Sequence, residues 1–246
     1  MVVFQALTWE ARDADDEHLI SIFGKTEHGK SVCLTTSFTP YLFIKLPADI
    51  NGQKIQRIYD IIDQKCRDSI TSYSVAKSKD VWGFQNNEEF PFMKLNFKDL
   101  QARRLVDSFL RKPLDRTPDL HEIFGVRNVK VYESNLDPML RLMHRTGIQS
   151  TGWLDTGDAC IRSHLANVDI DLFCNNWTTL KPVARDDIAP FVVASVDIEC
   201  NSSTGKFPDA EVVGDACFQI AISLCTFGSD EPYDKTCLCY KQTDPN

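Results

Sequence analysis

Residues 191–199, which read Phe191-Val-Val-Ala-Ser-Val-Asp-Ile-Glu199, form the stretch around which the rest of the chain is organised. Its apolar and small side chains predict a strand buried inside a sheet. Because side chains alternate along a strand, Asp197 and Glu199 point to the same face. Two carboxylates side by side are costly to bury unpaired, so such a pair favours a cleft that holds a cation or a proton. The sequence therefore predicts a magnesium-type metal site here, and a solvated strand end is the plainer alternative.

The composition is that of a globular protein. The chain has 246 residues, of which 43% are hydrophobic, and this is enough for one large domain or two ordinary ones. We find no run of about 18 apolar residues and no basic-then-apolar leader, so we expect no membrane span, no secretion and an intracellular location. The net charge of −8 does not indicate a nucleic-acid partner. Residues 98–145 carry a local excess of lysine and arginine, which predicts at most a modest surface for a polyanion.

Two patterns in the chain are interpreted as coincidental. The nine cysteines are irregularly spaced, and Cys237-Leu-Cys239 lacks the two-residue gap of a zinc ribbon, so we expect reduced thiols. Residues 24–31 match the phosphate-binding pattern G-x-x-x-x-G-K-[ST], but β-branched residues and Pro40 follow where that motif needs a helix. We therefore predict a hairpin turn, with ATP binding as an alternative of low weight.

The first half of the chain predicts an α+β fold. A β-meander is expected over the first 47 residues, and from about residue 41 to 132 the order is β-α-β-β-α-β, as in RNA-recognition modules. The expected strands span residues 2–9, 18–23, 31–36, 41–46, 69–79, 92–97 and 127–132, and the expected helices span residues 50–66 and 99–110. The strand at 92–97 lacks the basic-Gly-aromatic run of an RNA-binding face, so we interpret this unit as a scaffold.

A helix is predicted over residues 133–145. Ser134 is the expected N-cap, Asp137 completes a capping box with it, and Pro138 suits the first turn. A short strand at Trp153 and an alternating strand over residues 167–173 follow it.

A domain boundary is predicted in the polar, proline-containing segment 181–190. Beyond it, residues 215–227 predict a strand that is the antiparallel neighbour of the carboxylate strand. Two strands alone are marginal, so we expect them to pack on the first domain or to be the front of something larger. Ser195 and Gln219 are interpreted as packing or supporting groups.

Taken in order, these segments resemble the N-terminal part of family B (delta-like) DNA polymerases. The segments that carry the resemblance are Phe38-Thr-Pro-Tyr41, Val81-Trp-Gly-Phe-Gln85, Phe92-Met-Lys-Leu95, Tyr132-Glu-Ser-Asn-Leu136, Leu140-Arg-Leu-Met143, Thr146-Gly-Ile148, Val192-Val-Ala-Ser-Val-Asp-Ile-Glu-Cys200, Gly205-Lys-Phe-Pro208 and Phe218-Gln-Ile-Ala221. The chain is most similar to the polymerases of large DNA viruses. The resemblance implies an N-terminal domain over residues 1–182, with an OB-like β-barrel and an RRM/ferredoxin-like unit at about 41–132. It also implies an incomplete RNase H-like 3′→5′ exonuclease domain over residues 190–246.

The resemblance further implies a DNA-directed DNA polymerase with a proofreading exonuclease. In it, Asp197 and Glu199 are catalytic residues and ligands of a two-metal Mg²⁺ site. Two acids supply only part of such a site, so we expect the fragment alone to be inactive, with the other exonuclease acids and the polymerase motifs beyond residue 246.

The partners that the resemblance implies are primer–template and single-stranded DNA, deoxynucleotides and a processivity clamp, without a membrane. The expected location is the nucleus or a cytoplasmic viral replication site. The competing hypothesis is a non-catalytic module that binds single-stranded nucleic acid through the β-α-β-β-α-β unit.

Overall fold

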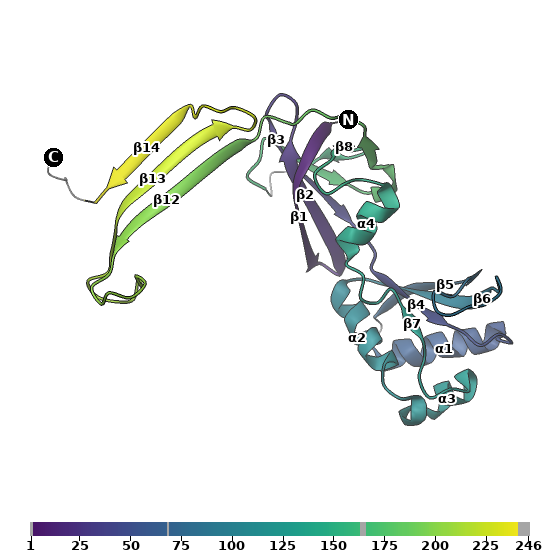
Figure 1. Cartoon of the computed structure of the whole chain (residues 1–246). Helices are drawn as coiled ribbons and strands as arrows, with labels where there is room; N and C mark the ends of the chain where they lie inside the picture. Colours follow the sequence, from purple (N-terminus) through teal and green to yellow (C-terminus); the bar gives the residue numbers. More distant parts are fainter. Residues whose placement is uncertain (1, 68, 163–165, 241–246) are drawn as a thin grey trace. The chain divides into compact units, whose positions relative to one another are not determined.

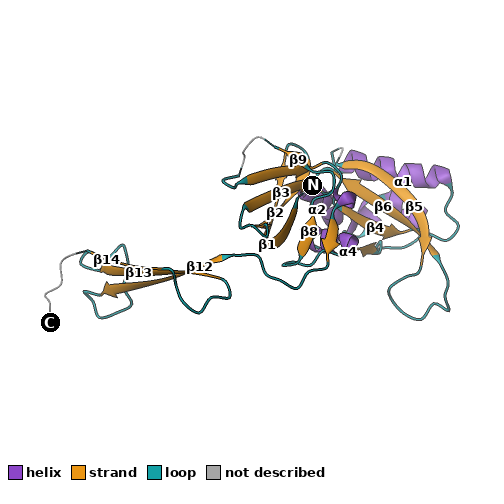
Figure 2. Cartoon of the chain, turned by 90° about the horizontal axis from the view of Figure 1, so that it is seen from above, coloured by secondary structure: helices purple, strands orange, loops and turns teal. Residues whose placement is uncertain are grey.

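The computed structural model describes residues 2–67, 69–162 and 166–240. The chain divides into two compact units, one formed by Met1–Gly24 with Ser31–Arg185 and the other by Lys25–Lys30 with Asp186–Asn246. Helices and strands both occur, so the chain has a mixed α+β fold, as expected (Figures 1 and 2). Residues 241–246 of the predicted exonuclease segment lie outside the described residues.

The first unit contains a seven-stranded sheet within the described residues, with the strand order β11-β8-β1-β2-β3-β10-β9. Its strands are β1 (Val3–Ala14), β2 (Glu17–Lys25), β3 (Ser31–Ser37), β8 (Trp153–Asp155), β9 (Cys160–Ile161), β10 (Ile170–Cys174) and β11 (Lys181–Val183). Strands β10 and β3 are parallel, with Ile170 opposite Val32. Because a parallel partner cannot follow through a tight hairpin, a long connection is needed between these two strands.

The same unit contains a four-stranded antiparallel sheet with the order β5-β6-β4-β7. Its elements are β4 (Tyr41–Lys45), α1 (Gly52–Lys65), β5 (Ile70–Ser78), β6 (Phe90–Phe97), α2 (Leu100–Leu110), the 3₁₀ turn η1 (Leu114–Arg116), α3 (Pro118–Phe124) and β7 (Val131–Tyr132). The unit also contains α4 (Pro138–Thr146) and a second 3₁₀ turn, η2 (Trp177–Thr179). The OB-like and RRM-like descriptions of these two sheets stay predictions.

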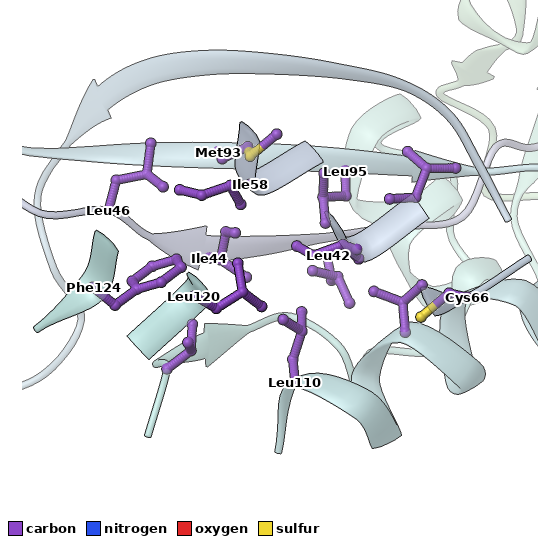
Figure 3. Close-up of a cluster of buried hydrophobic side chains, with 14 of the residues drawn as sticks. Leu42, Ile44, Leu46, Ile58, Cys66, Met93, Leu95, Leu110, Leu120 and Phe124 are labelled. Carbon is purple, nitrogen blue, oxygen red and sulfur yellow. The ribbon is translucent and has the colours of Figure 1, made fainter. Parts of the chain in front are cut away.

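The helices cover one face of the four-stranded sheet and form a core with it. Leu42 and Ile44 of β4 and Met93 and Leu95 of β6 are fully buried against apolar side chains of the helices, among them Ile58 (Figure 3). Each fully buried aliphatic side chain stabilises the fold by roughly 1.5–3 kcal/mol. Because strand side chains alternate, Tyr41 and its same-face neighbours must lie on the opposite face.

One detail of the meander differs from the sequence prediction. Strands β1, β2 and β3 are neighbours, as predicted, but β4 belongs to the other sheet. A meander assigns consecutive strands to one sheet by default, whereas here the apolar face of β4 packs against α1 and α2.

The phosphate-loop pattern at residues 24–31 forms a turn between β2 and β3. A hydrogen bond of 2.9 Å from the Thr26 N–H to the Lys30 carbonyl closes this turn. The predicted hairpin turn is therefore confirmed.

The predicted start of α4 was wrong. The helix begins at Pro138, and its N-cap is Asp137, whose carboxylate accepts the Met139 N–H at 2.7 Å. Ser134 instead accepts a hydrogen bond from the Arg111 guanidinium, and Glu133 has a positive φ of 57°, which a helix does not allow. Ser134 and Asp137 both match the capping pattern, so only tertiary contacts decide which of them caps the helix.

Other boundaries also differ from the sequence reading. The strand predicted over residues 127–132 is only Val131–Tyr132, because α3 and its flanking turns occupy the preceding segment. Helix α3 was not predicted. It begins at a proline, and its C-cap is Gly125, which has a left-handed φ of 64°.

The second unit contains a three-stranded antiparallel sheet within the described residues, in the order β12-β13-β14. Its strands are β12 (Val192–Asn201), β13 (Ala216–Thr226) and β14 (Asp234–Cys239), of which β14 was not predicted. The predicted antiparallel pairing of β12 with residues 215–227 is confirmed. The prediction that β12 is buried was wrong, because β12 is an edge strand and Val196 is 62% exposed.

None of the helices in residues 2–67, 69–162 and 166–240 has the length and apolarity needed to cross a membrane.

Candidate metal site on the β12–β13 sheet

Asp197 and Glu199 lie on one face of β12, two residues apart. In the antiparallel register, Asp197 is opposite Ala221 and Glu199 is opposite Gln219 of β13. A β-bulge follows directly after Glu199, where the register shifts between Glu199 and Cys200. Such bulges bend a strand and re-aim its side chains. The sheet thus presents both carboxylates from the same face next to an irregular strand end.

The two carboxylates have no ion-pair partner in the described part of the chain. No ion pair within residues 2–67, 69–162 and 166–240 involves Asp197 or Glu199. Asp197 Oδ1 accepts one hydrogen bond, from the adjacent Ile198 N–H at 3.0 Å. Two neighbouring carboxylates with so few donors favour a cation between or beside them.

A groove of about 380 Å³ runs over the three strands beside Asp197. Ser195 and Asp197 line it from β12, Ala221 from β13, and Lys235 and Cys237 from β14. Ala221 is small, so the space next to Asp197 stays open. Glu199 does not line this groove, although it shares the face with Asp197.

Sequence reasoning missed the contribution of β14 to this groove. Lys235 is opposite Ser223, and Cys237 is opposite Ala221 in the register of β13 and β14. The amide nitrogen of Gln219 donates to Cys237 Sγ at 2.8 Å. The alternation of Lys235, Cys237 and Cys239 was a usable signal, but the short segment lacks the length of its two neighbouring strands.

The carboxylate oxygens of Asp197 and Glu199 suit magnesium, but they supply only part of the ligands that a magnesium site needs. Carboxylate oxygens are the hard ligands that Mg²⁺ prefers, and Mg²⁺ sites commonly use one or two carboxylates with waters and substrate phosphate. Among the described residues, no group of three or more histidine, cysteine, aspartate or glutamate side chains is close enough to hold an ion. Asp197 and Glu199 therefore fit as two ligands of a divided site, and their role stays a prediction.

The loop between β12 and β13 is organised by Asp215. Its carboxylate accepts the Ser203 N–H at 2.6 Å, the Ser203 hydroxyl at 2.7 Å and the Asp209 N–H at 3.1 Å. The hydrogen bonds from Ser203 and Asp209 lower the pKa of Asp215. Phe207 of this loop is 93% exposed.

The segment that contains Asp197 and Glu199 is similar to a known protein family. Residues 129–246, which include the whole of β12 and both carboxylates, match the family model of the family B DNA polymerase exonuclease domain. This segment thus carries the sequence pattern of a family B exonuclease domain.

The relatives of the chain are DNA polymerases. It is 29% identical to a DNA polymerase of Acanthamoeba polyphaga mimivirus over 98% of this chain and 15% of the relative. It is also 29% identical to a DNA polymerase of Paramecium bursaria Chlorella virus NY2A, over 98% of this chain and 25% of the relative. The DNA polymerase delta catalytic subunit of Schizosaccharomyces pombe is 25% identical over 97% of this chain and 22% of its own length.

A solved structure agrees with the sequence relatives at the level of the fold. The family B DNA polymerase of Pyrobaculum calidifontis matches with a TM-score of 0.66 and 16% identity, over 98% of this chain and 27% of that chain. The resemblance to family B polymerases that the sequence indicates is therefore confirmed. The chain spans a quarter or less of the length of these curated relatives.

Proposed function

We propose that this chain is the N-terminal part of a DNA-directed DNA polymerase with a 3′→5′ proofreading exonuclease. The observation that carries the proposal is the position of Asp197 and Glu199 on one face of β12, within the segment that matches the exonuclease family model. Its substrates are primer–template DNA and deoxynucleotides, and its exonuclease acts on single-stranded primer ends. A processivity clamp is a further proposed partner.

Asp197 and Glu199 are the proposed ligands contributed by this segment. Two Mg²⁺ ions, when bound, activate the attacking water and stabilise the leaving oxygen of the cleaved phosphodiester. The carboxylates hold their positions because the β12–β13 ladder fixes the backbone on both sides of them. The small Ala221 leaves room beside Asp197 for a phosphate and its waters.

The same proposal explains why the two acids face outward here. Strand β12 is the edge of its sheet and presents unpaired backbone N–H and C=O groups, which a further strand of a larger domain would pair. The first portion of an RNase H-like sheet, with further acids supplied from elsewhere in the full-length enzyme, has this property.

The experiment that tests the proposal uses the full-length enzyme with Asp197→Ala and Glu199→Ala together. Excision of a mismatched primer end and extension of a matched primer are measured on the same preparation. Loss of excision with preserved extension supports the assignment. Normal excision by the double variant would show that these acids are not the exonuclease ligands.

A further inference from the structure

The groove beside Asp197 has two walls, and each wall is a row of side chains that runs across the three strands. In one row, Ser195 is opposite Ser223, and Ser223 is opposite Lys235. The other row on the same face consists of Asp197, Ala221 and Cys237. Because the residues between the rows point to the other face of the sheet, the space of about 380 Å³ lies between the two rows.

The two rows differ in their chemistry. The hydroxyls of Ser195 and Ser223 and the ammonium of Lys235 can each donate a hydrogen bond. The opposite row has the Asp197 carboxylate at one end and the small side chain of Ala221 in its middle. A metal ion suits the carboxylate and an anion suits the donors. The groove therefore fits an anion that reaches a metal ion at one end.

Lys235 has no anionic partner within residues 2–67, 69–162 and 166–240. None of the ion pairs in these ranges involves Lys235, and its exposed side chain lines the groove. Asp197 lies at the diagonal corner of the same groove and is also without an ion pair. Strand β13 separates their two strands (Figure 1), so the backbones of β12 and β14 are roughly 10 Å apart. The groove thus has room for a phosphate between the carboxylate and the ammonium.

Other ligands fit the Lys235 end of the groove less well. A metal cation next to Lys235 would be repelled by the ammonium. An apolar ligand would bury the ammonium without a partner, which is costly. A phosphate avoids both penalties, because its oxygens accept hydrogen bonds from the ammonium and from the serine hydroxyls.

We propose that Lys235 binds a backbone phosphate of the strand that the exonuclease excises, next to the phosphate that is cleaved. This inference rests on the proposed function of Asp197 and Glu199. The cleaved phosphate lies at the metal ligands of β12, so an ammonium on β14, two strands away, contacts a neighbouring phosphate. Ser223, opposite Lys235, is placed to donate a second hydrogen bond to the same phosphate. Lys235 is therefore a substrate-binding residue and not a metal ligand.

The first measurement is the excision of a single-stranded oligothymidylate by the full-length enzyme in Mg²⁺. Lys235→Gln is expected to raise KM by about five- to tenfold with kcat nearly unchanged, because a contact with a phosphate that does not react stabilises ground state and transition state alike. The slope of log(kcat/KM) against log salt should become shallower by about 0.7, the contribution of one phosphate contact on a single strand. Lys235→Arg keeps the charge and should restore both values.

The second measurement needs neither metal nor cleavage. A primer–template with 2-aminopurine at a mismatched primer end is bound to the full-length enzyme in EDTA. The fluorescence of 2-aminopurine rises when this base leaves the stack, so it reports the separated primer end. Lys235→Gln is expected to lower this fluorescence, because the separated strand loses a phosphate contact in the groove.

The matched control is Lys206→Gln. Lys206 is an exposed lysine of the loop between β12 and β13, and it does not line the groove. This variant is expected to behave like the wild type in both measurements. Lys235 is also exposed, so its replacement should leave the sheet folded, and thermal unfolding of each variant verifies this.

Three results would overturn the proposal. The first is an unchanged KM, salt slope and fluorescence in a folded Lys235→Gln variant. The second is a fall in kcat with an unchanged KM, which a contact with a neighbouring phosphate does not produce. The third is an equal effect of Lys206→Gln, which would show that general charge and not the groove binds the strand.

Failure of this inference is distinguishable from failure of the proposed function. If the Asp197→Ala/Glu199→Ala variant excised mismatched ends normally, the proposed function would fail, and this inference with it. If that double variant lost excision while Lys235→Gln behaved like the wild type, only the role of Lys235 would be wrong.

Discussion

At the scale of single residues, Asp80 is a buried acid with several hydrogen-bond donors. Its carboxylate is 2% exposed, although the residue as a whole is half-buried. It is 2.7 Å from the Lys45 ammonium and accepts the Tyr132 hydroxyl at 2.9 Å and the Trp82 N–H at 3.2 Å. Burial acts to raise the pKa of Asp80, but the hydrogen bonds from Lys45, Trp82 and Tyr132 outweigh it and hold the pKa well below its usual range.

This network predicts a loss of stability in acid. Because the folded pKa of Asp80 is lower than its unfolded value of about 3.9, its stabilising contribution is present above that pH and is lost as the pH falls below it. We expect Asp80→Asn to lower the free energy of unfolding at pH 7 by about 1–3 kcal/mol. The difference from the wild type should shrink below about pH 4. Urea unfolding at a series of pH values measures both effects.

The control for this prediction is Asp119→Asn. Asp119 forms an ion pair with Arg57 at 2.6 Å, but both side chains are more than half exposed, at 57% and 52%. Its loss is expected to cost less than about 1 kcal/mol, since solvent screens exposed pairs. Equal effects of the two substitutions would contradict the central role of Asp80.

A second prediction at the residue scale concerns the two carboxylates of β12. In the full-length enzyme, Asp197→Ala with Glu199→Ala should slow excision of mismatched primer ends by more than about 100-fold. Replacing even a residue that only supports a metal ligand costs about 10–100-fold in activity, and these substitutions remove the ligands themselves. Primer extension should be retained, because we propose that these two acids serve excision alone. Quenched-flow measurement of both reactions tests this, with Asp230→Ala/Glu231→Ala as the control pair on an exposed loop.

At the scale of elements, the close approach of β1 to β2 explains why position 24 must be a glycine. A Cβ at Gly24 would overlap the carbonyl oxygen of Gln5 on β1 and lie 2.8 Å from the Phe4 ring. Backbone atoms on a central strand cannot move aside without disturbing the ladder. Only a residue without a side chain fits this position, so the constraint is steric and not conformational.

This contact predicts that Gly24→Ala destabilises the chain. The expected cost is about 1–3 kcal/mol, the usual penalty for overpacking, measured by urea unfolding. The control is Gly52→Ala at the start of α1, where a Cβ meets open space. It should be neutral or stabilising by up to about 1 kcal/mol, because alanine favours helix more than glycine does. A neutral Gly24→Ala would show that β1 and β2 are farther apart than described.

At the scale of the whole molecule, the divided metal site sets a limit on activity. Asp197 and Glu199 come from one strand, and the described residues contain no cluster of three possible ligands. Two-metal hydrolysis needs more ligands than these to place both ions. We therefore propose that the site needs ligands supplied by other parts of the full-length enzyme.

We accordingly expect the purified 246-residue chain neither to extend primers nor to degrade DNA efficiently. Gel assays with labelled single-stranded and primer–template DNA in Mg²⁺ measure both activities. The Asp197→Ala variant of the same chain is the control for contaminating nucleases. A metal-dependent exonuclease activity that Asp197→Ala removes would contradict the prediction and indicate a self-contained nuclease.

Sequence patterns predicted local structure well in segments whose apolar residues follow a single clear period. The helix expected over residues 50–66 is observed as α1, with Ile58 and Ile62 buried and Asn51 as its cap. The strand β13 also followed from alternation, and its expected antiparallel pairing with β12 is observed. The failures have tertiary causes, as at Ser134, where a contact with Arg111 replaced the predicted capping role.

What the sequence by itself determined is the chemistry of the candidate metal site and the side of the strand on which it lies. Alternation along β12 is a property of the backbone, so Asp197 and Glu199 share a face wherever the strand is placed. Only the tertiary structure decided the sheet to which β4 belongs, the exposure of β12 and the groove beside Asp197. Each of these features depends on contacts between segments that are distant in the sequence. A local sequence pattern does not show which distant segments will pack together.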